Sequence, residues 1–164
     1  MSTYTCSCCG RILDGLPTDR AFTLPDDVWA LPEPERTEKA KWNSDLCQFG
    51  ERNFIRALLG LPFSEREGYF GWGLWVEVDW PVFERYLALY DQDATTEQPH
   101  PALIANQPEG YDHVVGTRAS IQFGIASQRP RIIMPADSKH QLAIDSKGLS
   151  SERYHQILVH IGAA

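Results

Sequence analysis

Alternation of apolar and polar positions dominates the middle of the chain. Between residues 53 and 61 the apolar side chains stand at odd positions: Ile55, Ala57, Leu59 and Leu61. Between residues 69 and 79 they stand at even positions: Phe70, Trp72, Leu74, Val76 and Val78. A period of two is typical of a half-buried strand, and the polar segment 62–68 between the two runs predicts a hairpin. We therefore expect Trp72 in the core and Trp75 on the opposite face of its strand.

Other segments show helical spacing. Pro81 is suited to the first turn of a helix, and an apolar stripe recurs after it at three- and four-residue intervals. Its members are Val82, Phe83, Tyr86, Leu87 and Tyr90. A last helix is predicted after Ser150, which suits the N-cap position, and its buried face would hold Tyr154, Ile157, Leu158 and Ile161. Two short helices are predicted over 26–31 and 35–42, punctuated by Pro32 and Pro34.

The remaining apolar segments predict the overall architecture. Residues 119–125, 131–134 and 141–145 favour strands, and the polar segment 91–101 favours a surface loop. Helices and strands are partly segregated along the chain, which predicts an α+β fold with a mostly antiparallel sheet and a few helices packed on it. We expect one domain over 1–164, with an N-terminal cysteine knuckle and short strands in 1–24 and the main core in 45–164.

The net charge of the chain limits the kinds of molecule that it is expected to bind. The chain has 22 acidic and 15 basic residues, a formal charge of −7 and a pI of about 5.2. Binding to a nucleic-acid backbone rests on clustered Lys and Arg, so no nucleic-acid partner is expected. No apolar run approaches the about 18 residues that a membrane helix needs, and the first residues do not form a secretory signal. We therefore expect a cytoplasmic protein without a membrane partner.

Cysteines provide the one local motif with chemical content, Cys6-x-x-Cys9-Gly10. Two cysteines around a tight turn are typical of a zinc knuckle, and Cys47 would be the third ligand of a zinc cofactor. The fourth ligand stays open: the candidates are Asp14 and the histidines His100, His113, His140, His155 and His160. The competing interpretation is that these are small buried thiols in a turn. A redox pair is disfavoured, because a strand-like segment follows the motif where a helix would be needed.

Catalytic motifs are missing from the sequence: it has no nucleophile elbow, phosphate-binding loop or His-Glu-x-x-His pattern. The acidic residues in 26–38 are interpreted as a solvated face. A second candidate site is Trp75, which follows Gly71 and Gly73 on its strand face and stands close to Glu77 and Asp79. An exposed tryptophan with acidic neighbours is suited to anchor a protein partner. The alternative is that a helix covers that face as well.

Several short motifs in order resemble a known bacterial family. They are Cys6-x-x-Cys9-Gly10 with Gly15-Leu16-Pro17, Ser44-Asp45-Leu46-Cys47, the Phe70–Val76 stretch, Phe83-Glu84-Arg85-Tyr86, Gln128-Arg129-Pro130, and His140-x-Leu142-Ala143 with Gly148. Together they resemble the domain-of-unknown-function family numbered 2199. The resemblance implies a small bacterial cytoplasmic protein with no established reaction. In that family a histidine commonly stands two residues before Gly-Leu-Pro, where this chain has Leu13, so a metal site using that histidine would be incomplete here.

Three functional hypotheses follow from the sequence. The first is a non-enzymatic binding protein, of the immunity type, whose acidic surface neutralises a basic protein toxin through Trp75, Glu77 and Asp79. The second is a zinc-containing protein with a structural or regulatory role. The third is a small hydrolase or transferase with a site assembled from distant residues, such as His113, Arg118 and Asp145.

Overall fold

The computed structural model describes residues 4–5, 9–10, 12–13 and 16–163. The strands are β1 (Tyr4–Thr5), β2 (Ile12–Leu13), β3 (Asp19–Ala21), β4 (Ala40–Trp42), β5 (Leu46–Phe49), β6 (Arg52–Pro62), β7 (Tyr69–Val78), β8 (His100–Ile104), β9 (Arg118–Gln122) and β10 (Arg131–Ile133). The helices are α1 (Asp26–Trp29), α2 (Glu33–Lys39), α3 (Trp80–Leu89), α4 (Gln141–Asp145) and α5 (Ser151–His160). The α+β class is confirmed, and strands make up most of the regular structure.

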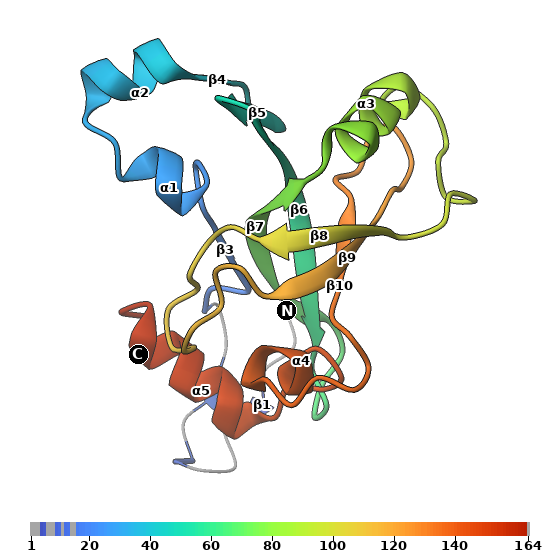
Figure 1. Ribbon diagram of the computed structural model, residues 1–164. Coiled ribbons are helices and arrows are strands. Elements are labelled where there is room, and N and C mark those ends of the chain that lie inside the picture. Colours follow the sequence, from blue (N-terminus) through green and yellow to red (C-terminus); the bar gives the residue numbers. More distant parts are fainter. Residues whose placement is uncertain (1–3, 6–8, 11, 14–15, 164) are drawn as a thin grey trace.

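The main sheet closes on itself. Strands β6, β7, β8, β9 and β10 form a ring, which is completed by a parallel pairing of β10 with β6 at Arg131 and Leu58. Strands β5 and β4 continue the sheet from the first half of β6, and β3 lies parallel to β7. Among the described strands of this sheet, six pairings are antiparallel and two are parallel, so the sheet is mostly antiparallel as predicted, but its closure into a ring was not predicted. Figure 1 shows α1, α2 and α3 at one end of the molecule and α4 and α5 at the other.

The predicted hairpin is confirmed as β6 and β7, the longest pair of the sheet. Ile55 lies opposite Val76 and Leu59 opposite Trp72, so the odd residues of β6 and the even residues of β7 point to the same side. That side is the main core, and all four side chains are buried there with residues of the surrounding strands and helices. The period-two pattern therefore fixed the register, because a slip of one residue would expose this whole set.

The other face of the hairpin is also covered. Trp75 and Phe54 pack there with Val28 of α1 and Cys47 of β5 in a second apolar cluster. The buried Asn106 holds α1 against β7: its carbonyl oxygen accepts the Trp75 amide at 2.7 Å, and its amide nitrogen donates to the Asp26 carboxylate at 2.8 Å. Asp26 is thus a structural hydrogen-bond acceptor, and its interpretation as part of a solvated face is wrong.

Some elements differ from the predictions. Residues 141–145 form helix α4 instead of a strand, and the side chain of His140 caps it by accepting the Leu142 amide at 3.0 Å. Strand β8 begins in the last two residues of the predicted loop 91–101 and continues to Ile104, and its pairing with β7 and β9 holds it in the sheet. The predicted helices after Pro81 and after Ser150 are confirmed, with the Ser150 hydroxyl accepting the Arg153 amide.

In the part of the chain that the structure describes, every helix is too short or too polar to cross a membrane.

Candidate protein-binding surface

Acidic residues concentrate at the end of the molecule that carries α1, α2 and α3. Residues 26–38 hold five carboxylates and one arginine, a formal charge of −4, and residues 77–97 hold six carboxylates and one arginine, a formal charge of −5. The whole chain carries −7, so the remainder is slightly positive. We name these two segments the acidic end, and Figure 1 shows their helices at the same end of the sheet.

Arg52 joins the two segments of the acidic end. Its guanidinium bonds the Glu77 carboxylate at 2.8 and 3.1 Å and reaches the Asp27 carboxylate at 2.9 Å. The hydrogen bond to Glu77 is the main cause of the raised pKa of Arg52. Glu77, which was predicted to contact a protein partner, is therefore already engaged in an ion pair within the chain, and through Arg52 its carboxylate helps to hold α1 to β7.

Helix α3 presents an apolar face to solvent. Trp80 is 49% exposed and Leu87 is 42% exposed, although both are large hydrophobic residues. They stand seven residues apart, with the exposed Glu84 between them at four-residue spacing from Trp80, so all three lie on one side of the helix. Phe83 and Tyr86 on the other side are buried. We name Trp80, Glu84 and Leu87 the α3 outer face.

The residues predicted for partner binding are placed differently by the structure. Trp75 has no exposed surface, and its indole N–H donates to the Phe22 carbonyl at 3.0 Å. The prediction of an exposed Trp75 anchor is therefore wrong, because α1 covers this face of the sheet. Asp79 is exposed and directly precedes α3, as expected for a surface acid. Trp80 is the exposed tryptophan next to it. Helical spacing did not reveal its exposure, because Phe83 and Leu87 of the predicted buried stripe follow Trp80 at three- and seven-residue spacing.

Cys9 and Cys47 are both free thiols in the described structure. Cys47 is 1% exposed within the second apolar cluster, and burial raises the pKa of its thiol to about 11. Cys9 is exposed, and Cys6 lies outside the described residues. Strand β5 lies between β4 and β6, and β1 pairs with β2. The expected proximity of Cys6, Cys9 and Cys47 stays a prediction, because Cys6 is not among the described residues.

No group of three or more potential metal ligands occurs within residues 4–5, 9–10, 12–13 and 16–163. The predicted zinc cofactor stays a prediction, because Cys6 stands outside this range.

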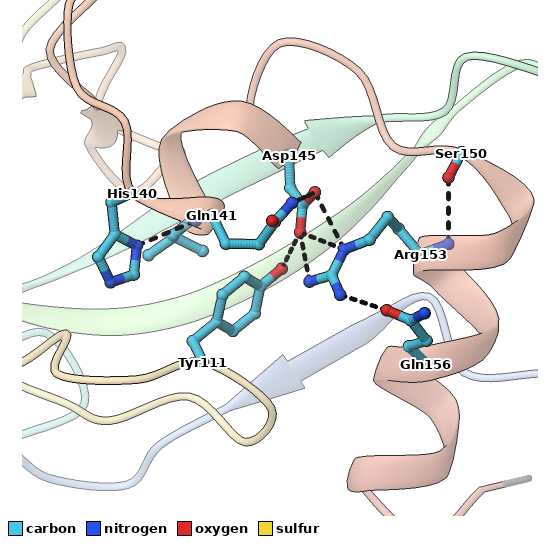
Figure 2. A network of polar contacts seen from close by, with 8 residues as sticks. Tyr111, His140, Gln141, Asp145, Ser150, Arg153 and Gln156 are labelled. Atoms are coloured by element: carbon cyan, nitrogen blue, oxygen red, sulfur yellow. Dashed lines mark hydrogen bonds and ion pairs between the residues drawn. The ribbon is translucent and has the colours of Figure 1, made fainter.

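Asp145, one of the distant residues suggested for catalysis, lies at the centre of a buried polar network. Figure 2 shows its carboxylate facing Tyr111, Gln141 and Arg153. It accepts the Tyr111 hydroxyl at 2.6 Å, the Gln141 amide at 2.8 Å and the Arg153 guanidinium at 2.9 Å. The other two suggested residues, His113 and Arg118, are exposed and form no hydrogen bond or ion pair with it in the described structure. The structure does not bring this predicted triad together.

The chemistry of the network is that of a structural anchor. Burial, with the charge of Asp145, raises the pKa of Tyr111, so its hydroxyl stays protonated and keeps donating to the carboxylate. Asp145 belongs to α4, Arg153 to α5 and Tyr111 to the segment between β8 and β9. The three contacts therefore link α4 and α5 to the segment between β8 and β9. The Asp145 carboxylate takes part in all three, so it is not free to act as a general base.

Fold and surface define a small α+β protein with a closed main sheet, an acidic end and an exposed tryptophan on α3. The chain belongs to a family described as an uncharacterized protein conserved in bacteria (DUF2199), whose model matches residues 5–148. This confirms the resemblance carried by the short motifs. Comparison with curated proteins and with solved structures found no match.

Proposed function

We propose that this protein binds a basic protein partner through its acidic end, with the α3 outer face at the centre of the interface. The observation that carries the proposal is the exposed pair Trp80 and Leu87 on a helix whose segment has a formal charge of −5. A neutralising role of the immunity type, in which the partner is a toxin, is the form of this function that we propose.

Physical chemistry supports this pairing of features. When a partner removes large, half-exposed apolar side chains from water, the binding free energy becomes more favourable. Tryptophan is also enriched among the residues that dominate binding energy at interfaces. Carboxylates around them attract a basic surface over distances of about 10 Å and disfavour acidic partners. Asp79 and Glu84 are exposed beside the anchors, so they are available to set orientation and association rate.

The test begins with capture of partners from a bacterium that encodes the protein. Wild type, Trp80→Ala and Glu84→Lys are compared with two matched control variants on α5, at the opposite end of the molecule. These are Val159→Ala, which truncates an exposed apolar residue, and Glu152→Lys, which reverses an exposed acid. The proposal is supported if a basic protein is captured by the wild type and by both control variants but by neither α3 variant.

The purified partner is then measured by surface plasmon resonance at low and high salt. Trp80→Ala is expected to weaken binding by about 2 kcal/mol, mostly through faster dissociation. Glu84→Lys is expected to slow association, and the difference from wild type should shrink as salt rises. Equal binding of all variants, or a partner with an acidic surface, would contradict the proposal.

A further inference from the structure

A cavity opens where the ring of strands is joined most weakly. Strands β6 and β10 share a single paired position, Arg131 with Leu58, and one further hydrogen bond runs from the Leu58 amide to the Pro130 carbonyl at 2.9 Å. Along this seam lies a cavity of about 1140 Å³, bounded by β6, by the segment 126–134 and by the inner side of α3. Ligand pockets commonly measure about 300–1,000 Å³, so the volume admits a small organic molecule.

The cavity wall combines aliphatic and aromatic side chains. Leu59, Ile132 and Met134 contribute aliphatic surface, and Tyr86 and Tyr90 of the α3 region contribute aromatic rings. Burial is the main cause that raises the pKa of Tyr86 to about 12, so its hydroxyl is neutral at physiological pH. The wall therefore suits a molecule with an apolar or aromatic body.

The charges around the cavity oppose those of the protein as a whole. Arg129, Arg131 and Lys147 line it, against a single lining carboxylate, Asp45. Asp45 already accepts the Tyr90 hydroxyl at 2.6 Å and faces the Arg129 guanidinium at 3.3 Å. Three lining cations face one lining carboxylate in a chain whose net charge is −7.

One arginine at this cavity, Arg131, lacks a compensating acid among the described residues. Arg131 makes no side-chain hydrogen bond or ion pair with any described residue, whereas Arg20, Arg85 and Arg153 elsewhere each pair with a carboxylate. Nearby Arg56 donates to the Ser44 carbonyl at 3.3 Å, and its Nε is buried without a hydrogen-bond partner among the described residues. Burial is the main cause that lowers the pKa of Arg56; the charge of Arg129 lowers it further, and the charge of Asp45 opposes this.

We propose that this cavity binds a small organic anion, with its apolar body against the aliphatic and aromatic wall and its carboxylate or phosphate group at Arg129 and Arg131. Arg129 and Arg131 stand two residues apart in an extended segment, so both can face the same anionic group. Binding there is a property separate from the partner interface, because the α3 outer face points away from the cavity side of the helix.

The test uses three small probes that share a phenyl ring: benzoate, phenyl phosphate and the neutral benzyl alcohol. Each is titrated into the protein while backbone amide resonances are followed by NMR. Arg131→Gln is the site variant, and Arg118→Gln is the matched control, an exposed arginine on β9 that does not line the cavity. Neither arginine has a partner in the described structure, so both variants should fold like wild type.

We expect at least one of the two anions to shift resonances of residues 57–60 and 126–134. Benzyl alcohol should bind at least about ten-fold more weakly than that anion. Arg131→Gln should weaken the anion about ten-fold or more, and Arg118→Gln should leave it within about two-fold. Tighter binding of phenyl phosphate indicates a phosphate ligand, and tighter binding of benzoate a carboxylate ligand. Equal binding of benzyl alcohol, an unchanged Arg131→Gln variant, or no localised shifts at the solubility limit would overturn the proposal.

Discussion

Replacing Trp75 by alanine should destabilise the fold far more than replacing Trp80. Trp75 is fully buried in the second apolar cluster, and truncation of a buried tryptophan costs about 3–5 kcal/mol through lost transfer free energy and the cavity left behind. The Phe22 carbonyl would also lose its hydrogen bond from the indole, which adds about 1 kcal/mol. Trp80 is half exposed, so Trp80→Ala should cost about 1 kcal/mol or less.

Urea unfolding followed by far-ultraviolet circular dichroism measures both variants against the wild type. Domains of this size are stable by about 5–15 kcal/mol, so Trp75→Ala could unfold outright. Trp75→Phe keeps most of the packing volume and loses the indole hydrogen bond, so it should fold and cost about 1–2 kcal/mol. A cost below about 1 kcal/mol for Trp75→Ala, or a larger cost for Trp80→Ala, would refute the assignment of these two tryptophans.

Three further predictions concern stability. Asp145→Asn should cost about 3–5 kcal/mol in urea unfolding, because it leaves the Arg153 guanidinium without its buried counter-charge; a cost below about 1 kcal/mol would contradict the anchor role. Burial raises the pKa of the Cys47 thiol from 9.0 to about 11, so the unfolded state releases this proton first and stability should fall as pH rises between these values. Cys47→Ala should show a shallower fall over that range, and an identical slope would contradict the buried thiol. Gly110→Ala should lower the melting temperature, because Gly110 has a φ of +91° and an added Cβ would lie 2.8 Å from the His160 ring, whereas Gly124→Ala meets open space and should have little effect.

Local periodicity predicted the hairpin well. Both long strands are buried mainly on one side, so the apolar alternation of Ile55, Leu59, Trp72 and Val76 reports the core directly. The helix after Pro81 was found for the same reason, although Leu87 was assigned to its buried stripe and is exposed. Residues at the edge of an apolar helical stripe are buried only if a neighbouring element covers them, and the local sequence does not predict how far that cover extends.

What the sequence could not predict depends on long-range contacts. Trp75 is buried because α1 is held over it by Asn106, which lies 31 residues further along the chain. Asn106 accepts the backbone amide of Trp75 and donates to Asp26 of α1. Glu77 is engaged by Arg52, which is 25 residues away. Closure of the ring rests on one paired position between β6 and β10, and no local pattern marks such a contact. The cavity along that seam could not be predicted either, because it depends on the same long-range contact between β6 and β10.

The central claim is that the acidic end binds a basic protein. Hydrogen–deuterium exchange of the protein, measured by mass spectrometry with and without the captured partner, tests it most directly. The account predicts slower exchange in peptides covering residues 79–91 on partner binding, and unchanged exchange in peptides covering α5. Protection confined to α5, or no protection over residues 79–91 at saturating partner, would contradict it.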